Sequence, residues 1–334
     1  MWAAAEGHAA MVKLLAEAGA SVNARATALQ FPKITFNGST MVSTPLPRGG
    51  MTALLIAARE NSLAGARALI EAGADLNLPD TEGTTPLIMA IVNRHNDVAA
   101  LLIEKGADLN AADVTGMTAL YAAVDLRQLG SLINRPTPPP TGDIDNLTIV
   151  SMLLDRGANP NARLRLPTLP RFHNAGDAQL AEGATPLMRA ARGKDIPIMR
   201  ALLTKGADPN LATKNYMTPL MFASAGGGRN RGPESQTVEA VKVCLEHGAD
   251  VRAFDNNGAT ALHTAAGAGM DAVVKVLVEH GADLDVQDKS GRTPLDIAMG
   301  VSPTGFVGRR GAAPGQARES TAALLKSLAA AKEN

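Results

Sequence analysis

Histidine is the side chain best suited to metal binding or to proton transfer near neutral pH, and this 334-residue chain has six. Five of them occur at positions that recur along the chain, which favours structural roles: His8, His95, His247, His263 and His280. The sixth, His173, stands apart, but no second His or Cys lies near it to complete a metal site. We therefore predict no metal site and no cofactor.

Two further patterns suggest chemistry but have simpler explanations. Asp143 and Asp145 could contact a cation, but they directly precede a predicted helix over 147–154, where a carboxylate serves as an N-cap. The glycines at 226–228 precede two arginines, but the segment lacks the spacing and the Lys-Ser/Thr ending of a phosphate-binding loop. We interpret it as a linker. No nucleophile with a matching base is identifiable, so we predict that the chain is not an enzyme.

Charge and composition narrow the possible partners. The chain has 32 Lys and Arg against 32 Asp and Glu, so no net field attracts nucleic acid or an anionic surface, and we interpret its small basic clusters as solvated surface. The single cysteine, Cys244, excludes an internal disulfide. No apolar run approaches the roughly 20 residues that span a bilayer, so we expect no membrane insertion. The cellular compartment stays open.

Two sequence patterns repeat in phase along the chain. Glycines followed by Ala-(Asp/Asn/Ser) occur at Gly19, Gly73, Gly106, Gly157, Gly206, Gly248 and Gly281. Thr-(Pro/Ala)-Leu triplets end at Leu54, Leu87, Leu120, Leu187, Leu220, Leu262 and Leu295. Four steps between successive triplets, and two between successive glycines, equal 33 residues.

Each repeat has the residues of a helix pair followed by a turn. Thr before Pro, as in Thr85–Pro86, predicts a helix N-cap followed by a first-turn proline. The segment 271–281 then has Val and Leu at helical spacing, and Gly281 predicts a left-handed C-cap. An Asp-x-x-Gly sequence, as in Asp80–Gly83, follows as a turn signal and predicts a β-finger.

This pattern resembles the ankyrin repeat, in an array of bacterial type with long inserted loops. The resemblance implies an all-α solenoid with β-finger hairpins and about eight repeats, the first and last incomplete. We place a single solenoid over 1–334, with repeats at approximately 1–25, 49–80, 82–113, 115–163, 182–213, 215–255, 257–288 and 290–331. The insertions fall at 26–48, 128–146, 164–181, 225–235 and 300–317.

The insertions and the two ends carry their own expectations. The Asn-Gly pair within 34–42, flanked by β-branched and aromatic residues, predicts a hairpin. The Pro- and Arg-containing segment 164–176 predicts an extended or turn-rich chain. Residues 319–331 predict a closing helix with a polar outer face. Because Met1 aligns inside the first helix of a repeat, we expect that more repeats precede it or that this end packs on something else.

The resemblance also implies which residues contact a partner. In ankyrin repeats the second residue after the triplet leucine generally faces the concave groove; here that position holds Trp2, Ile56, Met89, Ala122, Arg189, Phe222, Thr264 and Ile297. Their apolar character fits either a recognition strip or a groove covered by the inserted loops. The finger tips are the second implied contact region: Lys214, Asn215, Tyr216, Asn256, Asn257 and Lys289. Tyr216 replaces the tip glycine, so its finger is the least certain.

Together these observations predict a non-enzymatic scaffold that binds a protein or peptide through its fingers, groove and inserted loops. The alternative is self-assembly into a filament or lattice, in which the incomplete first repeat and the loops pack on other copies of the chain. An enzyme is the third possibility and needs a domain outside this chain, because a fold alone does not specify a reaction.

Overall fold

The computed structural model describes residues 1–28, 49–127, 142–166, 180, 182–225, 233–301 and 318–332. Sixteen helices lie in these ranges. The contacts divide the chain into two compact units, Met1–Gly176 and Asp177–Asn334. Each unit is a stack of helix pairs, and the repeat boundaries predicted above remain predictions.

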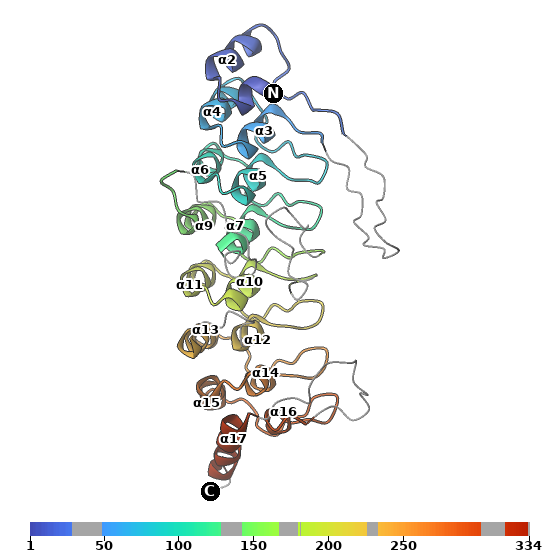
Figure 1. Ribbon diagram of the computed structural model, residues 1–334, viewed down its shortest axis with the longest axis vertical. Helices are drawn as coiled ribbons and strands as arrows, with labels where there is room; N and C mark the ends of the chain where they lie inside the picture. Colours follow the sequence, from blue (N-terminus) through green and yellow to red (C-terminus); the bar gives the residue numbers. More distant parts are fainter. Residues whose placement is uncertain are drawn as a thin grey trace. The chain divides into compact units, whose positions relative to one another are not determined.

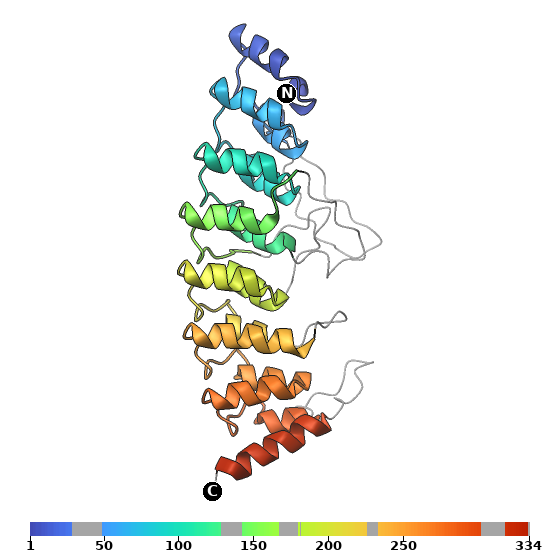
Figure 2. The same cartoon turned by 90° about the vertical axis from the view of Figure 1, so that its left-hand side faces the viewer.

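The first unit contains four helix pairs. The first helices of the pairs are α1 (Trp2–Ala5), α3 (Ala53–Arg59), α5 (Pro86–Val92) and α7 (Ala119–Arg127). The second helices are α2 (Ala9–Glu17), α4 (Leu63–Glu71), α6 (Asn96–Glu104) and α9 (Asn146–Asp155). Within this unit each helix packs on its partner in the pair and on the corresponding helix of the next pair (Figures 1 and 2). The helix predicted at 147–154 is present as α9, and it packs on α7.

The second unit repeats this arrangement. Its first helices are α10 (Pro186–Gly193), α12 (Pro219–Ser224), α14 (Ala261–Ala268) and α16 (Pro294–Ala298). Its second helices are α11 (Ile196–Thr204), α13 (Glu234–Glu246), α15 (Asp271–Glu279) and α17 (Glu319–Lys332), stacked side by side in Figure 2. The closing helix predicted at 319–331 is present as α17. Small residues keep the two helices of a pair close, since alanines such as Ala265 and Ala266 are fully buried.

The helices begin and end where the sequence predicts. Thr85 Oγ1 accepts a hydrogen bond from Ile88 N at 3.3 Å, with Pro86 in the first turn, and the same N-cap occurs at Thr185, Thr218 and Thr293. Asp145 Oδ1 caps α9 by accepting from Thr148 N at 2.7 Å, which confirms the capping explanation for this carboxylate. Gly281, which follows the last turn of α15, has φ 88°, in the left-handed region that favours glycine.

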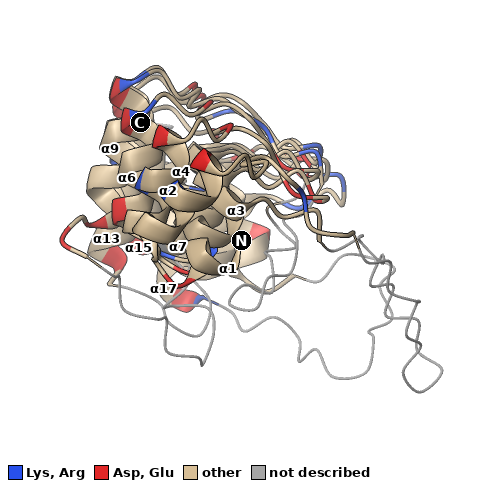
Figure 3. Cartoon of the chain, turned by 90° about the horizontal axis from the view of Figure 1, so that it is seen from above, with Lys and Arg blue, Asp and Glu red and all other residues tan. Residues whose placement is uncertain are grey.

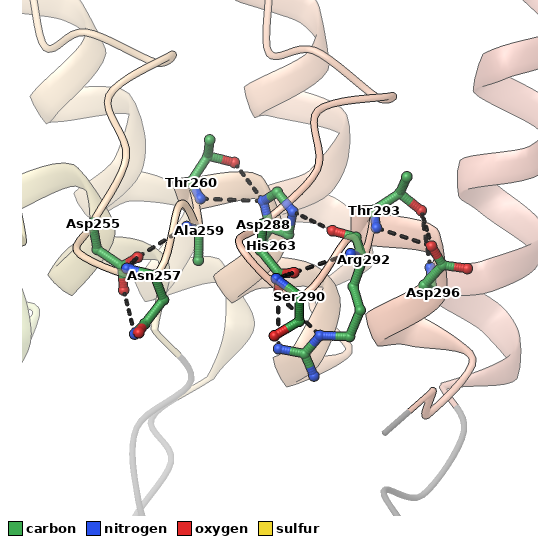
Figure 4. Close-up of polar contacts among 10 residues, drawn as sticks. All are labelled: Asp255, Asn257, Ala259, Thr260, His263, Asp288, Ser290, Arg292, Thr293 and Asp296. Atoms are coloured by element: carbon green, nitrogen blue, oxygen red, sulfur yellow. Dashed lines mark hydrogen bonds and ion pairs between the residues drawn. The ribbon is translucent and has the colours of Figure 1, made fainter. Parts of the chain in front are cut away.

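His263 adds a link between successive repeats (Figure 4). Its Nδ1 lies 3.1 Å from Thr260 N and its Nε2 lies 3.1 Å from the Arg292 carbonyl oxygen. Because that carbonyl only accepts, Nε2 carries the proton and Nδ1 accepts from the backbone of Thr260. Burial lowers the pKa of His263, which favours this neutral form. The ring is thus structural, as its recurring position predicted.

The fingers are not the β-hairpins that the resemblance implied. Among the described residues they are turns, with isolated β-bridges only at Ala112–Thr118 and Phe254–Thr260. The Asp carboxylate holds the turn instead: Asp80 Oδ1 accepts from Glu82 N at 2.9 Å and from Thr84 N at 2.8 Å. A tip of four residues closed by its own side chain leaves too little chain for a strand ladder. The hairpin predicted at 34–42 lies outside the described residues.

Successive fingers are joined by backbone hydrogen bonds within each unit. In the first unit Val114 N donates to Glu82 O at 2.9 Å. In the second, Asn256 N donates to Asn215 O at 3.0 Å and Lys289 N to Asn257 O at 2.8 Å. These bonds order the tips as one edge in each unit, so that side chains of neighbouring fingers have fixed spacing.

Two cations anchor first helices at their C-terminal ends. Arg94 Nη2 donates to Leu126 O of α7 at 3.0 Å. Lys194 Nζ donates to Phe222 O at 2.8 Å and to Ala225 O at 3.0 Å, at the end of α12. Both residues lie seven positions after a triplet leucine, and in each case the next repeat carries a predicted insertion between its helices. The cations therefore bind helix-end carbonyls where the short connecting turn of a regular repeat is absent.

Candidate interaction surfaces

The groove positions differ widely in exposure. Ile56 and Met89 are partly exposed in the first unit, as are Thr264 and Ile297 in the second. Arg189 and Phe222, in contrast, are only 2% and 1% exposed, and Ala122 is 1% exposed. The positions do not form one continuous strip of accessible apolar side chains.

Arg189 and Phe222 were predicted to contact a partner, and the structure corrects this. Phe222 belongs to α12, all six residues of which are buried, and its carbonyl oxygen is bound by Lys194 Nζ. Arg189 lies among the buried residues of α10. A side chain with almost no accessible area offers a partner no contact, so neither residue belongs to the candidate surface.

The finger tips of the second unit are the more accessible region. Tyr216 is 59% exposed, and Asn256, Asn257 and Lys289 are exposed. The side-chain amides of Asn256 and Asn215 also meet, with Nδ2 3.2 Å from Oδ1. We define the finger surface as Tyr216, Phe254, Asn256, Asn257 and Lys289, since Phe254 lies in the same finger as the two asparagines.

Tyr216 occupies a backbone position that favours glycine. Its φ is 59°, whereas the residues at the same place in other fingers are Gly83, Gly258 and Gly291, with φ of 78°, 76° and 73°. At the corresponding glycines a Cβ would lie 3.1 Å from Lys289 N in the case of Gly258 and would meet nothing within 4 Å in the case of Gly291. A left-handed residue with a Cβ costs about 1–2 kcal/mol. The finger forms despite this strain, with Tyr216 N donating to Thr213 O at 2.9 Å.

Phe254 is a candidate that the sequence analysis missed. It is 65% exposed, immediately before the Asp that closes its finger. The same place in other fingers holds a smaller or polar residue: Pro79, Ala112, Ala212 or Gln287. Comparing the residue before the finger Asp in each repeat would have identified Phe254 from the sequence. Large exposed aromatic side chains are enriched where proteins contact one another.

Charges around the finger surface are of both signs. Lys214 Nζ lies 2.7 Å from Glu182 Oε2, and this hydrogen bond raises the pKa of the lysine. The guanidinium of Arg292 is held by Asp288, with Nη2 2.7 Å from Oδ2. Figure 3 shows Lys and Arg interspersed with Asp and Glu. No block of one sign dominates the described residues, in agreement with the zero net charge.

The first helix pair provides a second exposed region, at the end of the first unit. Trp2 is 75% exposed, with its ring centroid 6.2 Å from that of His8. Met11, Leu14 and Leu15 of α2 are 47%, 58% and 43% exposed. A hollow of about 140 Å³ next to Leu15 is lined largely by apolar residues that include Val12, Ala53 and Leu69. We name Trp2, Met11, Leu14 and Leu15 the terminal face.

Metal binding and thiol reactivity can be judged for the described residues. No three His, Cys, Asp or Glu side chains in these ranges gather as metal ligands would. Burial raises the pKa of the Cys244 thiol to about 12, so the nucleophilic thiolate is disfavoured. Across the same residues no helix combines the length and apolar character needed to cross a membrane.

Comparisons with known proteins agree with this architecture. Family models described as "Ankyrin repeats (3 copies)" match residues 1–80, 27–113, 54–164 and 145–231, and one described as "Ankyrin repeats (many copies)" matches 245–298. The structure is similar to the crystal structure of the ankyrin repeat domain of Bcl-3, with a TM-score of 0.56 and 25% sequence identity, over 83% of this chain and 99% of that one.

Curated relatives match this chain over a small part of their own length. The chain is 26% identical to E3 ubiquitin-protein ligase KEG of Arabidopsis thaliana over 230 residues, which is 60% of this chain and 13% of that protein. It is 38% identical to Zygote-specific protein 3 of Chlamydomonas reinhardtii over 81 residues, which is 24% of this chain and 19% of that protein. The chain therefore spans less than a fifth of the length of either relative.

Proposed function

Because the chain belongs to the ankyrin-repeat family, we propose that it is a non-enzymatic scaffold that binds a protein or peptide partner through the finger surface of its second unit. We also propose that the array is of bacterial type and that its inserted loops contribute to binding. The partly exposed groove residues of the first unit, Ile56 and Met89, are further candidate contacts.

Tyr216 is the observation that carries the proposal. Its left-handed backbone lowers the stability of the finger, and its 59% exposed side chain recovers little by burial. Glycine at this place would relieve the backbone strain. A residue with an unfavourable backbone conformation that adds nothing to the stability of the fold is expected at a functional site. The exposed ring of Phe254, on the neighbouring finger, supports the same conclusion.

The finger surface has the chemistry of a protein-binding site. Tyr216 and Phe254 offer aromatic area, since aromatic side chains carry much of the binding energy at protein interfaces. Asn256 and Asn257 offer amide donors and acceptors suited to peptide backbone. The exposed ammonium of Lys289 adds a point of attraction for a carboxylate. This mixture fits a polypeptide better than nucleic acid, because the surface lacks a continuous row of cations.

The test is affinity capture from an extract of the source organism, with wild-type and variant chains as bait. Tyr216→Gly and Phe254→Ala should each weaken retention of the same partner by about 2 kcal/mol, roughly thirtyfold. Lys275→Ala, at an exposed position on α15, is the matched control and should retain the partner. Equal retention by all four chains would exclude the finger surface as the binding site.

A further inference from the structure

The carboxylates at the finger tips of the second unit are already bound within the fold. Asp255 Oδ1 accepts hydrogen bonds from Asn257 N at 2.8 Å and from Ala259 N at 2.9 Å. Asp288 Oδ1 accepts from Arg292 N at 3.0 Å, and its Oδ2 lies 2.7 Å from Nη2 of the same arginine. Both carboxylates hold their turns closed, so little of their acceptor capacity is left for a partner.

The lysines of the same tips are more available. Lys289 is exposed, and its ammonium makes no ion pair with any residue that the structure describes. Lys214 Nζ lies 2.7 Å from Glu182 Oε2, but the two side chains are 70% and 51% exposed, and such surface pairs contribute little. Further from the tips, exposed Arg252 and Asp285 occupy equivalent places in successive repeats and have opposite charges. The charge that the tips offer to a partner is therefore positive.

Lys214 and Lys289 occupy the same place in their fingers, with Asn256 at that place in the finger between them. Lys214 N donates to the carbonyl oxygen of the preceding tip at 2.8 Å, in the same pattern as the backbone bonds of Asn256 and Lys289. Because packed helices lie about 8–10 Å apart, two repeat steps separate the two lysines by roughly 16–20 Å. An extended chain rises about 3.3 Å per residue and covers this distance in about five or six residues.

The groups between the two lysines suit an extended polypeptide backbone. Asn256 Nδ2 lies 3.2 Å from Asn215 Oδ1, which leaves Asn256 Oδ1 as an acceptor and Asn215 Nδ2 as a donor for a partner. Tyr216 and Phe254, on the same two fingers, are 59% and 65% exposed and offer apolar contact area. A chain lying across the tips thus meets a lysine at each end and amides with aromatic rings between them.

We propose that the partner of the finger surface is an acidic, extended segment of polypeptide, with two carboxylates about five or six residues apart that bind Lys214 and Lys289. This inference rests on the proposed function of the finger surface and adds the chemistry of its partner. Two separated lysines match such a segment better than they match nucleic acid, which has a phosphate at every nucleotide.

Selection from a library of random peptides tests the proposal without assuming a sequence. Peptides of about twelve residues are long enough, since they extend to roughly 40 Å. The whole chain is the bait, and the Tyr216→Gly and Phe254→Ala chains identify those peptides that need the finger surface. These peptides should be enriched in Asp or Glu at two positions about five or six residues apart.

The outcomes of the selection separate this inference from the proposed function. Peptides that need the finger surface but show no acidic enrichment would overturn the inference and still support the proposed function. If no selected peptide needs the finger surface, both are contradicted.

Charge variants test the two lysine contacts with a selected acidic peptide. Lys214→Gln and Lys289→Gln should each weaken binding by about threefold at low salt and by less at high salt. Lys275→Gln, at an exposed position on α15 outside the fingers, changes the net charge equally and should leave the affinity unchanged. Equal weakening by all three variants would indicate an effect of net charge and count against the proposal.

Glu182→Gln gives a result that damage to the fold does not imitate. Removing this carboxylate frees Lys214, so affinity for the acidic peptide should rise by about twofold or more. Unchanged or weaker binding would overturn the contact with Lys214. A single-stranded DNA oligonucleotide serves as competitor: displacement of the peptide at equal concentration would show a general anion site and contradict the preference for polypeptide.

Discussion

Tyr216 and Lys194 share an unusual backbone conformation, with φ of 59° and 57°, but their side chains have opposite surroundings. The Tyr216 ring is exposed, and the Lys194 side chain lies in the core with its ammonium on two carbonyl oxygens. The αL strain at Lys194 is offset by these hydrogen bonds. Among the described residues no side-chain hydrogen bond of Tyr216 offsets its strain, so relief of the strain should be measurable.

Tyr216→Gly should therefore raise the free energy of unfolding by about 1 kcal/mol, since glycine adopts positive φ without steric cost but has greater freedom when unfolded. Chemical denaturation of the two proteins measures this difference. The same variant should lose partner binding, so that stability and binding change in opposite directions. A loss of stability above about 1 kcal/mol would show that the ring contributes to packing, and would remove the main support for a binding role.

Lys194 predicts a change of stability with pH. Burial lowers the pKa of its ammonium from 10.5 to about 8, whereas the pKa of Cys244 rises from 9 to about 12. Between pH 8 and 9 the unfolded chain holds more protons at Lys194 than the folded chain does, so this lysine makes stability rise with pH. Over the same interval the Cys244 thiol stays protonated in the fold, whereas in the unfolded chain it loses up to about half of its protons by pH 9. This opposes the effect of Lys194 and is smaller than it.

The expected gain from Lys194 between pH 8 and 9 is at most about 1.4 kcal/mol. Lys194→Met removes this contribution, so the wild type should gain unfolding free energy relative to the variant as the pH rises over this interval. Urea denaturation at several pH values provides the measurement. Parallel profiles would mean that Lys194 titrates in the fold at its ordinary pKa.

At the scale of helices and turns, the sequence predicted what depends on local chemistry. The Thr N-caps, the Pro in the first turn and the C-terminal glycines act within one turn of helix, so their residues identify the helix boundaries. The fingers were predicted less well, because a short Asp-closed turn and a β-hairpin share the same residues. The burial of Arg189 and Phe222 was missed, since it depends on packing between segments far apart in the chain.

The contacts of Arg94 and Lys194 were also not predicted from the sequence. Lys194 and the two carbonyl oxygens that it binds are 28 and 31 residues apart in the sequence. No local pattern indicates such a contact. The contact is suggested only when a long cationic side chain at the left-handed position occurs together with an insertion in the next repeat. The structure was needed to recognise that these two features occur together.

The packing of second helices gives a prediction at this scale. Leu277 of α15 is fully buried, where α15 packs on α13, α14 and α17. Leu277→Ala should lower the free energy of unfolding by about 2–5 kcal/mol, because it removes apolar contacts and leaves a cavity. Thermal or chemical denaturation checks this. A loss below about 1 kcal/mol would mean that the apolar face of α15 is assigned to the wrong side.

For the whole molecule, the division into two compact units raises the question of how far the destabilising effect of Leu277→Ala extends along the chain. Helices in a repeat array contact mainly their nearest neighbours, so stability is approximately a sum of local terms. Leu277→Ala should therefore accelerate amide hydrogen exchange in α13, α14 and α15 and leave α4, α5 and α6 protected as in the wild type. Mass spectrometry of peptides from both regions measures this. Equal acceleration in both regions would show that the chain opens as one cooperative body, and the two units would then describe contacts but not folding.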